Sequence, residues 1–218
     1  MTSLSLRLRQ LWTDSNAVAA TEFAIVVPFM LLLYIGGVEL GDGMSINVKV
    51  SKTAHTVADL VSQNTQVTAT QMQAILGAST ATIAPYHVTG GTGQSLITVT
   101  VSEVSTDASG NATVQWSRSF NGTTVSTGRP TGQTMTLPQS LTGTQNNNVS
   151  LILSEVAYAY TPNLGYTISG TITLRDSQYL FPRCSTNSPG NSSFPYYDVK
   201  FPSSATCSCI QHMQQKIC

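Results

Sequence analysis

The chain has 218 residues, of which only 9% are charged, and its formal net charge at pH 7 is zero. This length allows one medium-sized domain with its own core plus an N-terminal anchor. Lys and Arg are scattered singly beyond Gly41, whereas nucleic-acid binding needs clustered positive charge, so that class of function is excluded. Solubility comes instead from uncharged residues, namely Thr, Ser, Gly, Asn and Gln. This composition is typical of an extracytoplasmic surface or assembly protein rather than a cytosolic enzyme.

The N-terminal segment predicts a membrane anchor. Met1–Gln10 contains two arginines and no acid, and the positive-inside rule therefore places it in the cytoplasm. The apolar run Phe23–Val38 spans about 24 Å as a helix, against a hydrocarbon core of about 30 Å. The helix becomes long enough to span the membrane if Ala17–Thr21 and the glycines up to Gly41 are added to it. Glu22 then lies inside the membrane-spanning segment. A cleaved secretory signal is the alternative, although no small-x-small cleavage site follows the apolar run.

The stretch "AVAATEFAIVVPFMLLLYIGGVELG" (residues 17–41) resembles the N-terminal signature of TadE/TadG-type proteins of the tight-adherence (Flp) pilus system. It is similar to the class III signals of type IV pilins. The resemblance implies that prepilin peptidase cuts after Ala17, leaving Val18 as the new N-terminus, with Glu22 and Phe23 as the Glu-Phe pair. The family usually has Gly where this chain has Ala17.

The resemblance also implies an assembly role for Glu22, in which its carboxylate neutralises the α-amine of a neighbouring subunit. This is physically sound, because a buried charge is tolerated only when it is paired. The alternative is a Glu22 that lies at the inner headgroup level and has no partner role.

Helical periodicity continues beyond the anchor. Apolar residues recur at steps of three or four in Ile46, Val50, Ala54, Val57 and Val61, which predicts that the same helix extends to Gln63. His55 on this helix is interpreted as a surface histidine.

A second, short helix is predicted over Thr68–Ser79. Thr70 is its expected N-cap and Gly77 lies near its expected end. Ile75 and Leu76 are its predicted core contacts.

Beyond the second helix, apolar and polar residues alternate with a period of two, which predicts β-strands. Leu96–Val104 and Ala112–Phe120 alternate around a turn-rich hexapeptide and form a predicted β-hairpin. Gly122–Asn148 is predicted to be a long loop with one short strand near Thr134–Leu137.

Val149–Tyr160 is apolar on both faces and is predicted to be central in the sheet, with Glu155 in need of a partner or solvent. Tyr166–Leu174 is the last predicted strand, with Tyr166, Ile168, Ile172 and Leu174 on one face. The motifs at 155–162 and 179–183 again resemble the C-terminal half of TadE/TadG-like proteins.

The four cysteines, Cys184, Cys207, Cys209 and Cys218, all lie in the last fifth of the chain. An even number of late cysteines in an exported protein predicts a local disulfide framework that staples an irregular tail. A bridge between Cys207 and Cys209 would close a strained ring, so other pairings are favoured. Zinc is the weaker alternative, because structural zinc sites have longer spacers between paired ligands.

No catalytic motif stands out, so neither an enzyme nor a cofactor nor a metal site is expected. There is no Gly-x-Ser-x-Gly elbow, and His55, His87 and His212 lie far apart. Gly90–Gly93 lacks the Lys-Ser/Thr of a phosphate-binding loop and is interpreted as a plain loop.

The predicted fold is α+β, with a long N-terminal transmembrane and extended helix, a short second helix, an antiparallel sheet and a disulfide-stapled tail. The expected divisions are a leader at 1–17, the helix at 18–63, a periplasmic α+β domain at 64–183 and the cysteine-containing tail at 184–218.

The resemblance implies a minor pseudopilin, single-pass in a bacterial inner membrane, that associates with pilin and pseudopilin subunits. Its other implied partners are membrane lipid, the inner-membrane assembly platform and prepilin peptidase. The alternatives are an uncleaved envelope protein that tethers the pilus, and a displayed adhesive or ligand-binding module.

Overall fold

The computed structural model describes residues 15–107, 109–142, 149–162, 170–183, 185–186 and 196–202. The chain divides into two compact units. The first contains Met1–Met44 and Thr161–Gly170, and the second contains Ser45–Tyr160 and Thr171–Cys218.

The long N-terminal helix is a single element, α2 (Ser15–Ser62). It passes through Pro28 without ending, although a proline inside a helix removes one backbone hydrogen bond. The glycines do not end it either, and Gly37 and Gly41 have open space where a side chain would project. The predicted long helix is therefore confirmed, and its part up to Met44 belongs to the first unit.

The second helix, α3 (Ala69–Ile83), begins with a capping box. The Thr68 hydroxyl accepts a hydrogen bond from the Gln71 amide, and the Gln71 side chain accepts one from the Thr68 amide. The N-cap is thus Thr68 rather than the predicted Thr70, because a threonine followed three residues later by glutamine satisfies two orphan amides reciprocally. The helix also continues to Ile83, well past Gly77, because tertiary packing outweighs the low helix propensity of glycine.

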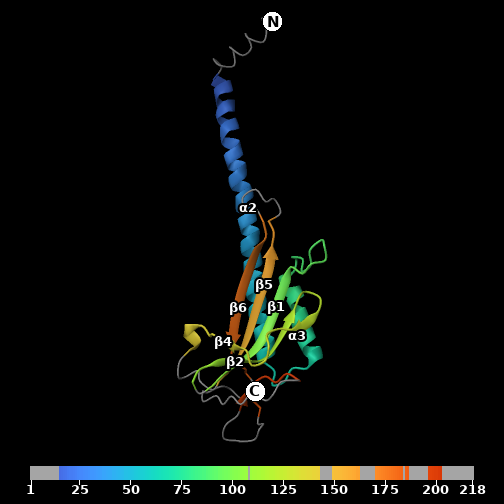
Figure 1. Cartoon of the computed structure of the whole chain (residues 1–218). Coiled ribbons are helices and arrows are strands. Elements are labelled where there is room, and N and C mark those ends of the chain that lie inside the picture. Colours follow the sequence, from blue (N-terminus) through green and yellow to red (C-terminus); the bar gives the residue numbers. More distant parts are fainter. Residues whose placement is uncertain are drawn as a thin grey trace. The chain divides into compact units, whose positions relative to one another are not determined.

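The sheet of the second unit is antiparallel and has the order β3-β2-β1-β5-β6, with β4 also paired to β2 (Figure 1). The strands are β1 (Ile97–Thr106), β2 (Ala112–Phe120), β3 (Val125–Thr127), β4 (Thr134–Met135), β5 (Ser150–Tyr160) and β6 (Ile172–Leu180). A 3₁₀ turn, η1 (Gln139–Leu141), follows β4, and a separate pair joins β7 (Ser185–Thr186) to β8 (Tyr196–Tyr197). The predicted hairpin and the predicted central strand are both confirmed.

The last strand of the sheet differs from its prediction. β6 begins at Ile172 and runs to Leu180, whereas the predicted strand ends at Leu174; the expected Tyr166 and Ile168 lie outside the described residues. β3 is absent from the prediction. Both β3 and β6 pair with only one neighbour along the sheet path, and such edge strands need less apolar alternation because one side faces solvent.

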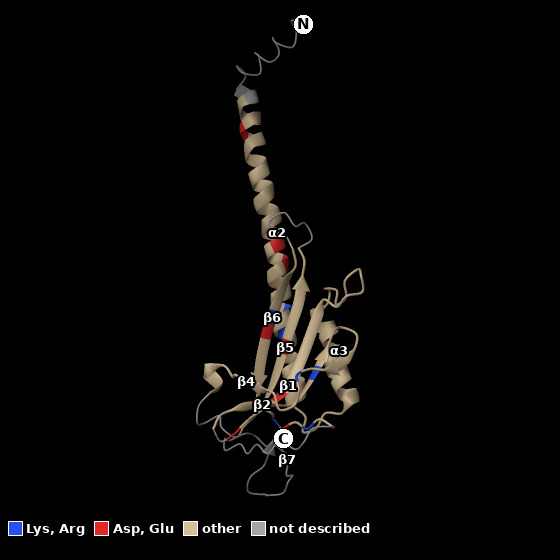
Figure 2. Ribbon diagram, viewed as in Figure 1, with Lys and Arg blue, Asp and Glu red and all other residues tan. Residues whose placement is uncertain are grey.

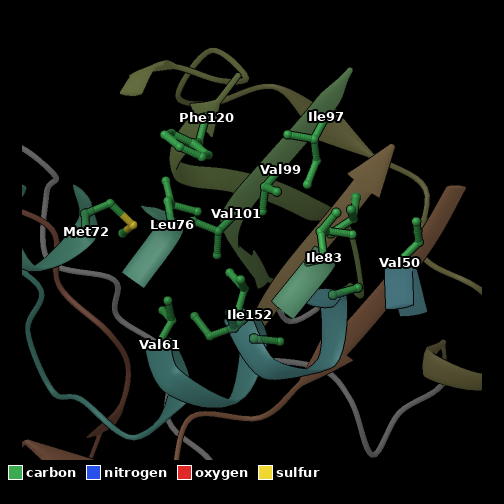
Figure 3. Close-up of a cluster of buried hydrophobic side chains, with 14 of the residues drawn as sticks. Val50, Val61, Met72, Leu76, Ile83, Ile97, Val99, Val101, Phe120 and Ile152 are labelled. Carbon is green, nitrogen blue, oxygen red and sulfur yellow. The ribbon is translucent and has the colours of Figure 1, made fainter. Parts of the chain in front are cut away.

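One face of the sheet packs against α3 and the second-unit part of α2 around a single apolar core. Figure 3 shows side chains from α2, α3 and the sheet converging. The predicted helix positions Ile46, Val50, Ala54, Val57 and Val61 are all at most 2% exposed, and Leu76 is fully buried. Ile75 is partly buried against the same core, so the predicted helix faces are confirmed.

A smaller apolar cluster lies on the other face of the sheet. It contains Leu151 and Leu153 of β5, while Ile152 and Val156 of the same strand belong to the larger core. The register between β1 and β2 shifts after Glu103, where the partner changes from Trp116 to Val114. Because a bulge changes which residues of a strand share a face, Ala112 of β2 joins Val104 of β1 in this second cluster, whereas Trp116 of β2 belongs to the larger core.

Candidate functional site

The N-terminal half of α2 is apolar on every side. Six consecutive residues, Phe29–Tyr34, each expose between 54% and 73% of their surface. Since one helical turn takes about 3.6 residues, these six cover the whole circumference. A core helix of a globular protein buries one face, whereas a helix that is apolar all round suits lipid. By length and composition α2 is able to cross a membrane.

Glu22 lies on this apolar surface near the start of α2. It is exposed, as are its neighbours Val18 and Phe23, at 47% and 67%. Between Glu22 and Glu39 the helix carries no charged residue, which Figure 2 shows as a long tan stretch of α2. Among the described residues the Glu22 carboxylate has no ion-pair partner.

The polar neighbour of Glu22 is satisfied within the helix. The Thr21 hydroxyl donates a hydrogen bond of 2.8 Å to the Val18 carbonyl, which hides its polarity from lipid.

The structure brings together only some of the residues singled out in the sequence. Val18, Glu22 and Phe23 share the exposed start of α2, and the backbone of Ala17 is part of the same helix. Cys184, Cys207, Cys209 and Cys218 lie outside the described residues. Within the described ranges, no three His, Cys, Asp or Glu side chains gather as a metal site.

A polar groove of about 820 Å³ lies on the sheet face opposite the helices. Hydroxyl side chains of β1, β2 and β6 line it, including Thr98, Thr100, Ser119 and Ser177. The loop between β3 and β4 forms one wall, and its Gly128 approaches Ser117 so closely that a Cβ atom there would clash.

Arg129 of this loop forms a two-pronged ion pair with Glu155 of β5. Arg129 Nη2 donates to Glu155 Oε1 at 2.9 Å, and Nη1 is paired with Oε2. Hydrogen bonding to Glu155 raises the pKa of Arg129. Sequence reasoning identified Glu155 as a residue in need of a partner, and the structure supplies Arg129.

Sequence reasoning missed a second acidic site, Glu103 of β1 and Asp198. Both side chains are fully buried, at 0% exposed. Glu103 occupies the next inward position after Ile97, Val99 and Val101, and this interruption of an apolar face was the available signal. Asp198 gave no such signal, because it follows an irregular Pro- and Ser-rich stretch.

Comparison with known proteins gives a match in the N-terminal region. Residues 17–59 match the model of a family described as TadE-like protein, which confirms the resemblance seen in the sequence. The matched stretch contains the exposed apolar helix, Glu22 and the first buried positions of the second unit. Comparison with curated proteins gives no match, and comparison with solved structures gives none either.

Proposed function

We propose that this protein is a pilin-like accessory protein, a minor pseudopilin, of tight-adherence pilus assembly or secretion. The observation that carries the proposal is the coincidence of the TadE-like match at residues 17–59 with a helix that is apolar all round. The apolar part of this helix, residues 15–38, contains one carboxylate, Glu22, for which the described residues provide no ion-pair partner. The protein acts by association between subunits and without catalysis.

The proposed topology is a single pass through a bacterial inner membrane. The two arginines before residue 10 and the absence of acid there favour a cytoplasmic N-terminus. The α+β unit then lies in the periplasm, where an oxidising environment suits the four late cysteines as disulfides.

The proposed assembly step pairs Glu22 with the α-amine of a neighbouring subunit. Cleavage between Ala17 and Val18 creates that amine four residues before Glu22. In hydrocarbon the two opposite charges each offset the desolvation of the other. Phe23, next to the carboxylate and 67% exposed, contributes apolar area to the same contact.

The proposed partners follow from this arrangement. They are pilin and pseudopilin subunits, membrane lipid, the inner-membrane assembly platform and prepilin peptidase. An uncleaved envelope anchor that tethers the pilus is the second candidate, favoured by Ala17 at the position where the family usually has glycine.

The test is the N-terminal residue of the protein purified from its own membranes, together with filament formation in Glu22→Ala, Glu22→Gln and the control Thr21→Ala. We expect a start at Val18 in every variant, and loss of filaments in the two Glu22 variants only. Glu22→Gln tests the charge itself, because glutamine keeps the shape of the side chain and removes its negative charge.

A start at Met1 in the wild type would overturn the processed-pseudopilin proposal and favour the permanent anchor. Normal filaments in Glu22→Gln would show that the charge of Glu22 has no part in assembly, even if cleavage is normal.

A further inference from the structure

Two fully buried carboxyl groups meet inside the second unit, and they leave most of their oxygens without partners. Glu103 Oε2 and both carboxylate oxygens of Asp198 have no hydrogen-bond donor among the described residues. Native proteins satisfy nearly all buried polar atoms, so such a cluster calls for an explanation. Two carboxylates in contact in a low-dielectric interior do not both ionise, because like charges repel and water is excluded.

Among the described residues, no positive charge compensates the pair. Glu103 Oε1 accepts hydrogen bonds from the Ser150 hydroxyl at 2.5 Å and from the Val199 amide at 3.1 Å. Burial raises the pKa of Glu103 well above its usual value, and the neighbouring Asp198 carboxyl raises it further. The two donors lower this pKa, but no basic side chain contributes.

Three charged groups on the neighbouring elements have partners elsewhere. On β2 the Arg118 guanidinium lies 4.5 Å from the centre of the Phe201 ring. On α2, Asp59 is paired with Arg183, and on β5 Glu155 lies on the opposite face of the sheet with Arg129. α3 has no charged residue. Lys200 follows Val199 in the chain and is half-buried.

Asp198 begins a four-residue segment, Asp198–Phe201, that is built into the unit. The Trp116 indole donates to the Val199 carbonyl at 2.7 Å. The Lys200 amide donates to the Thr65 carbonyl at 3.0 Å, and the Val67 amide donates to the Lys200 carbonyl at 2.8 Å.

The apolar side chains of the same segment are also buried. Val199 is 0% and Phe201 5% exposed, and the Phe201 ring lies 5.6 Å from that of Trp116. The segment therefore ties β2 to the turn between α2 and α3.

We propose that Glu103 keeps a proton that it donates to Asp198, and that this proton latches the segment Asp198–Phe201 onto Trp116 and the α2–α3 turn. With the proton bound, the Glu103 carboxyl donates to the Asp198 carboxylate and a single negative charge remains in the pair, while Ser150 and the Val199 amide donate to Glu103 Oε1. When the proton leaves, two charges oppose each other in the interior and the segment detaches.

The direction of the pH dependence follows from this exchange. A carboxyl that holds its proton more tightly when folded contributes stability that is fully present below its unfolded pKa and is lost as the pH rises through its folded pKa. For one proton, the ratio of unfolded to folded protein rises about tenfold per pH unit in that window. The latch is thus closed in acid and opens toward alkaline pH.

A hard divalent cation is the competing occupant of the pair. Calcium takes 6–8 oxygen ligands, whereas the described residues offer three unpartnered carboxylate oxygens here. One proton neutralises the repulsion without any further ligand, which favours the proton over the cation.

The test uses the full-length protein in detergent micelles with Trp12→Phe. The chain has two tryptophans, so this change makes Trp116 the sole reporter at the latch. Trp116 emission and the urea midpoint of unfolding are followed from about pH 5 to about pH 9. Two latch variants, Asp198→Asn and Glu103→Gln, are compared with the control Asp176→Asn, an acid on β6 outside the pair.

In the parent and in the control we expect the urea midpoint to fall with rising pH, and Trp116 emission to shift to the red before global unfolding. In Glu103→Gln we expect this dependence to vanish, because the amide has no titrating proton. In Asp198→Asn we expect it to weaken, because the repulsion is removed while Glu103 stays buried. If one latch variant fails to fold, the pH profile of the other variant, compared with that of the parent, still tests the proposal.

A flat parent profile would overturn the proposal, as would an unchanged slope in a folded latch variant. A rise in the midpoint at about pH 8 on adding calcium, reversed by EDTA and absent from the latch variants, would overturn it in favour of a cation site.

Discussion

Glu155 illustrates how a single polar residue is accommodated on a largely apolar strand. Its position between Leu153 and Ala157 leaves it on the sheet face opposite the helices, where Arg129 meets it with two nitrogens. The side chains of Arg129 and Glu155 are 28% and 33% exposed, so water screens the pair in part. Its main effect is to hold the β3–β4 loop against the sheet.

A double-mutant cycle on Arg129→Ala and Glu155→Ala measures this pair. We expect a coupling free energy of about 1 kcal/mol, at the upper end for exposed pairs because the geometry is two-pronged. Urea unfolding of the full-length protein in detergent gives the four free energies of unfolding.

High salt provides the control for the cycle, since partial exposure allows ions to screen the attraction. A coupling free energy near zero at low salt would show that the loop is held by the Gly128 approach and β-pairing alone.

At the scale of elements, α3 shows that a local sequence motif sets where a helix begins and that tertiary packing sets how far it extends. Its start is set locally by the capping box of Thr68 and Gln71. Its length is set by packing, because Met72, Leu76 and Ile83 are all fully buried against α2 and the sheet. Gly77 lies within the helix and is tolerated for that reason.

Leu76→Ala tests how much α3 depends on the core. Removing this fully buried side chain leaves a cavity between α3, α2 and β1, and we expect a loss of about 2–5 kcal/mol in the free energy of unfolding. Chemical denaturation in detergent micelles is the measurement.

Gln73→Ala on the exposed side of α3 is the matched control, with an expected change within about 0.5 kcal/mol. Equal effects of the two substitutions would contradict the placement of Leu76 in the core.

β6 shows where local pattern fails at the same scale. Its middle reads Arg175-Asp176-Ser177-Gln178, with no apolar alternation, yet it pairs with β5 over nine residues. The strand forms because β5 presents a full row of backbone partners, and an edge position leaves its side chains free to be polar. The sequence therefore predicted a last strand but placed it too early.

At the scale of the whole molecule, α2 contains two segments that differ in how their apolar residues are arranged around the helix. Residues 29–34 are apolar on all sides and suit hydrocarbon, whereas from Ile46 onward most apolar residues of α2 occupy one buried face, with Val48 as an exposed exception. This change from all-round to one-sided apolarity takes place within one helix and separates a segment that is able to cross a membrane from a core-forming segment.

Leu31→Arg tests the membrane segment. An arginine at this central position raises the insertion free energy by about 2.5–3.5 kcal/mol, so we expect much of the protein to lose membrane integration. Resistance to alkaline extraction of isolated membranes is the measurement.

Val48→Arg is the control, because Val48 is also exposed, at 65%, but lies well beyond the end of the apolar run at Val38. If Leu31→Arg stayed as firmly integrated as Val48→Arg, the segment would not lie in the hydrocarbon core.

The sequence by itself determined those features that depend on near neighbours. The long helix, the β1–β2 hairpin, the two-faced β5 and the TadE-like signature around Glu22 all rest on periods of about 3.6 or about 2 or on a short motif. The tertiary structure alone decided the partner of Glu155, the extent of β6, the existence of β3 and the meeting of Glu103 with Asp198. The contacts of Glu155 and Glu103 join residues separated by 26 to 96 positions, and only the closed fold brings such residues within hydrogen-bonding distance.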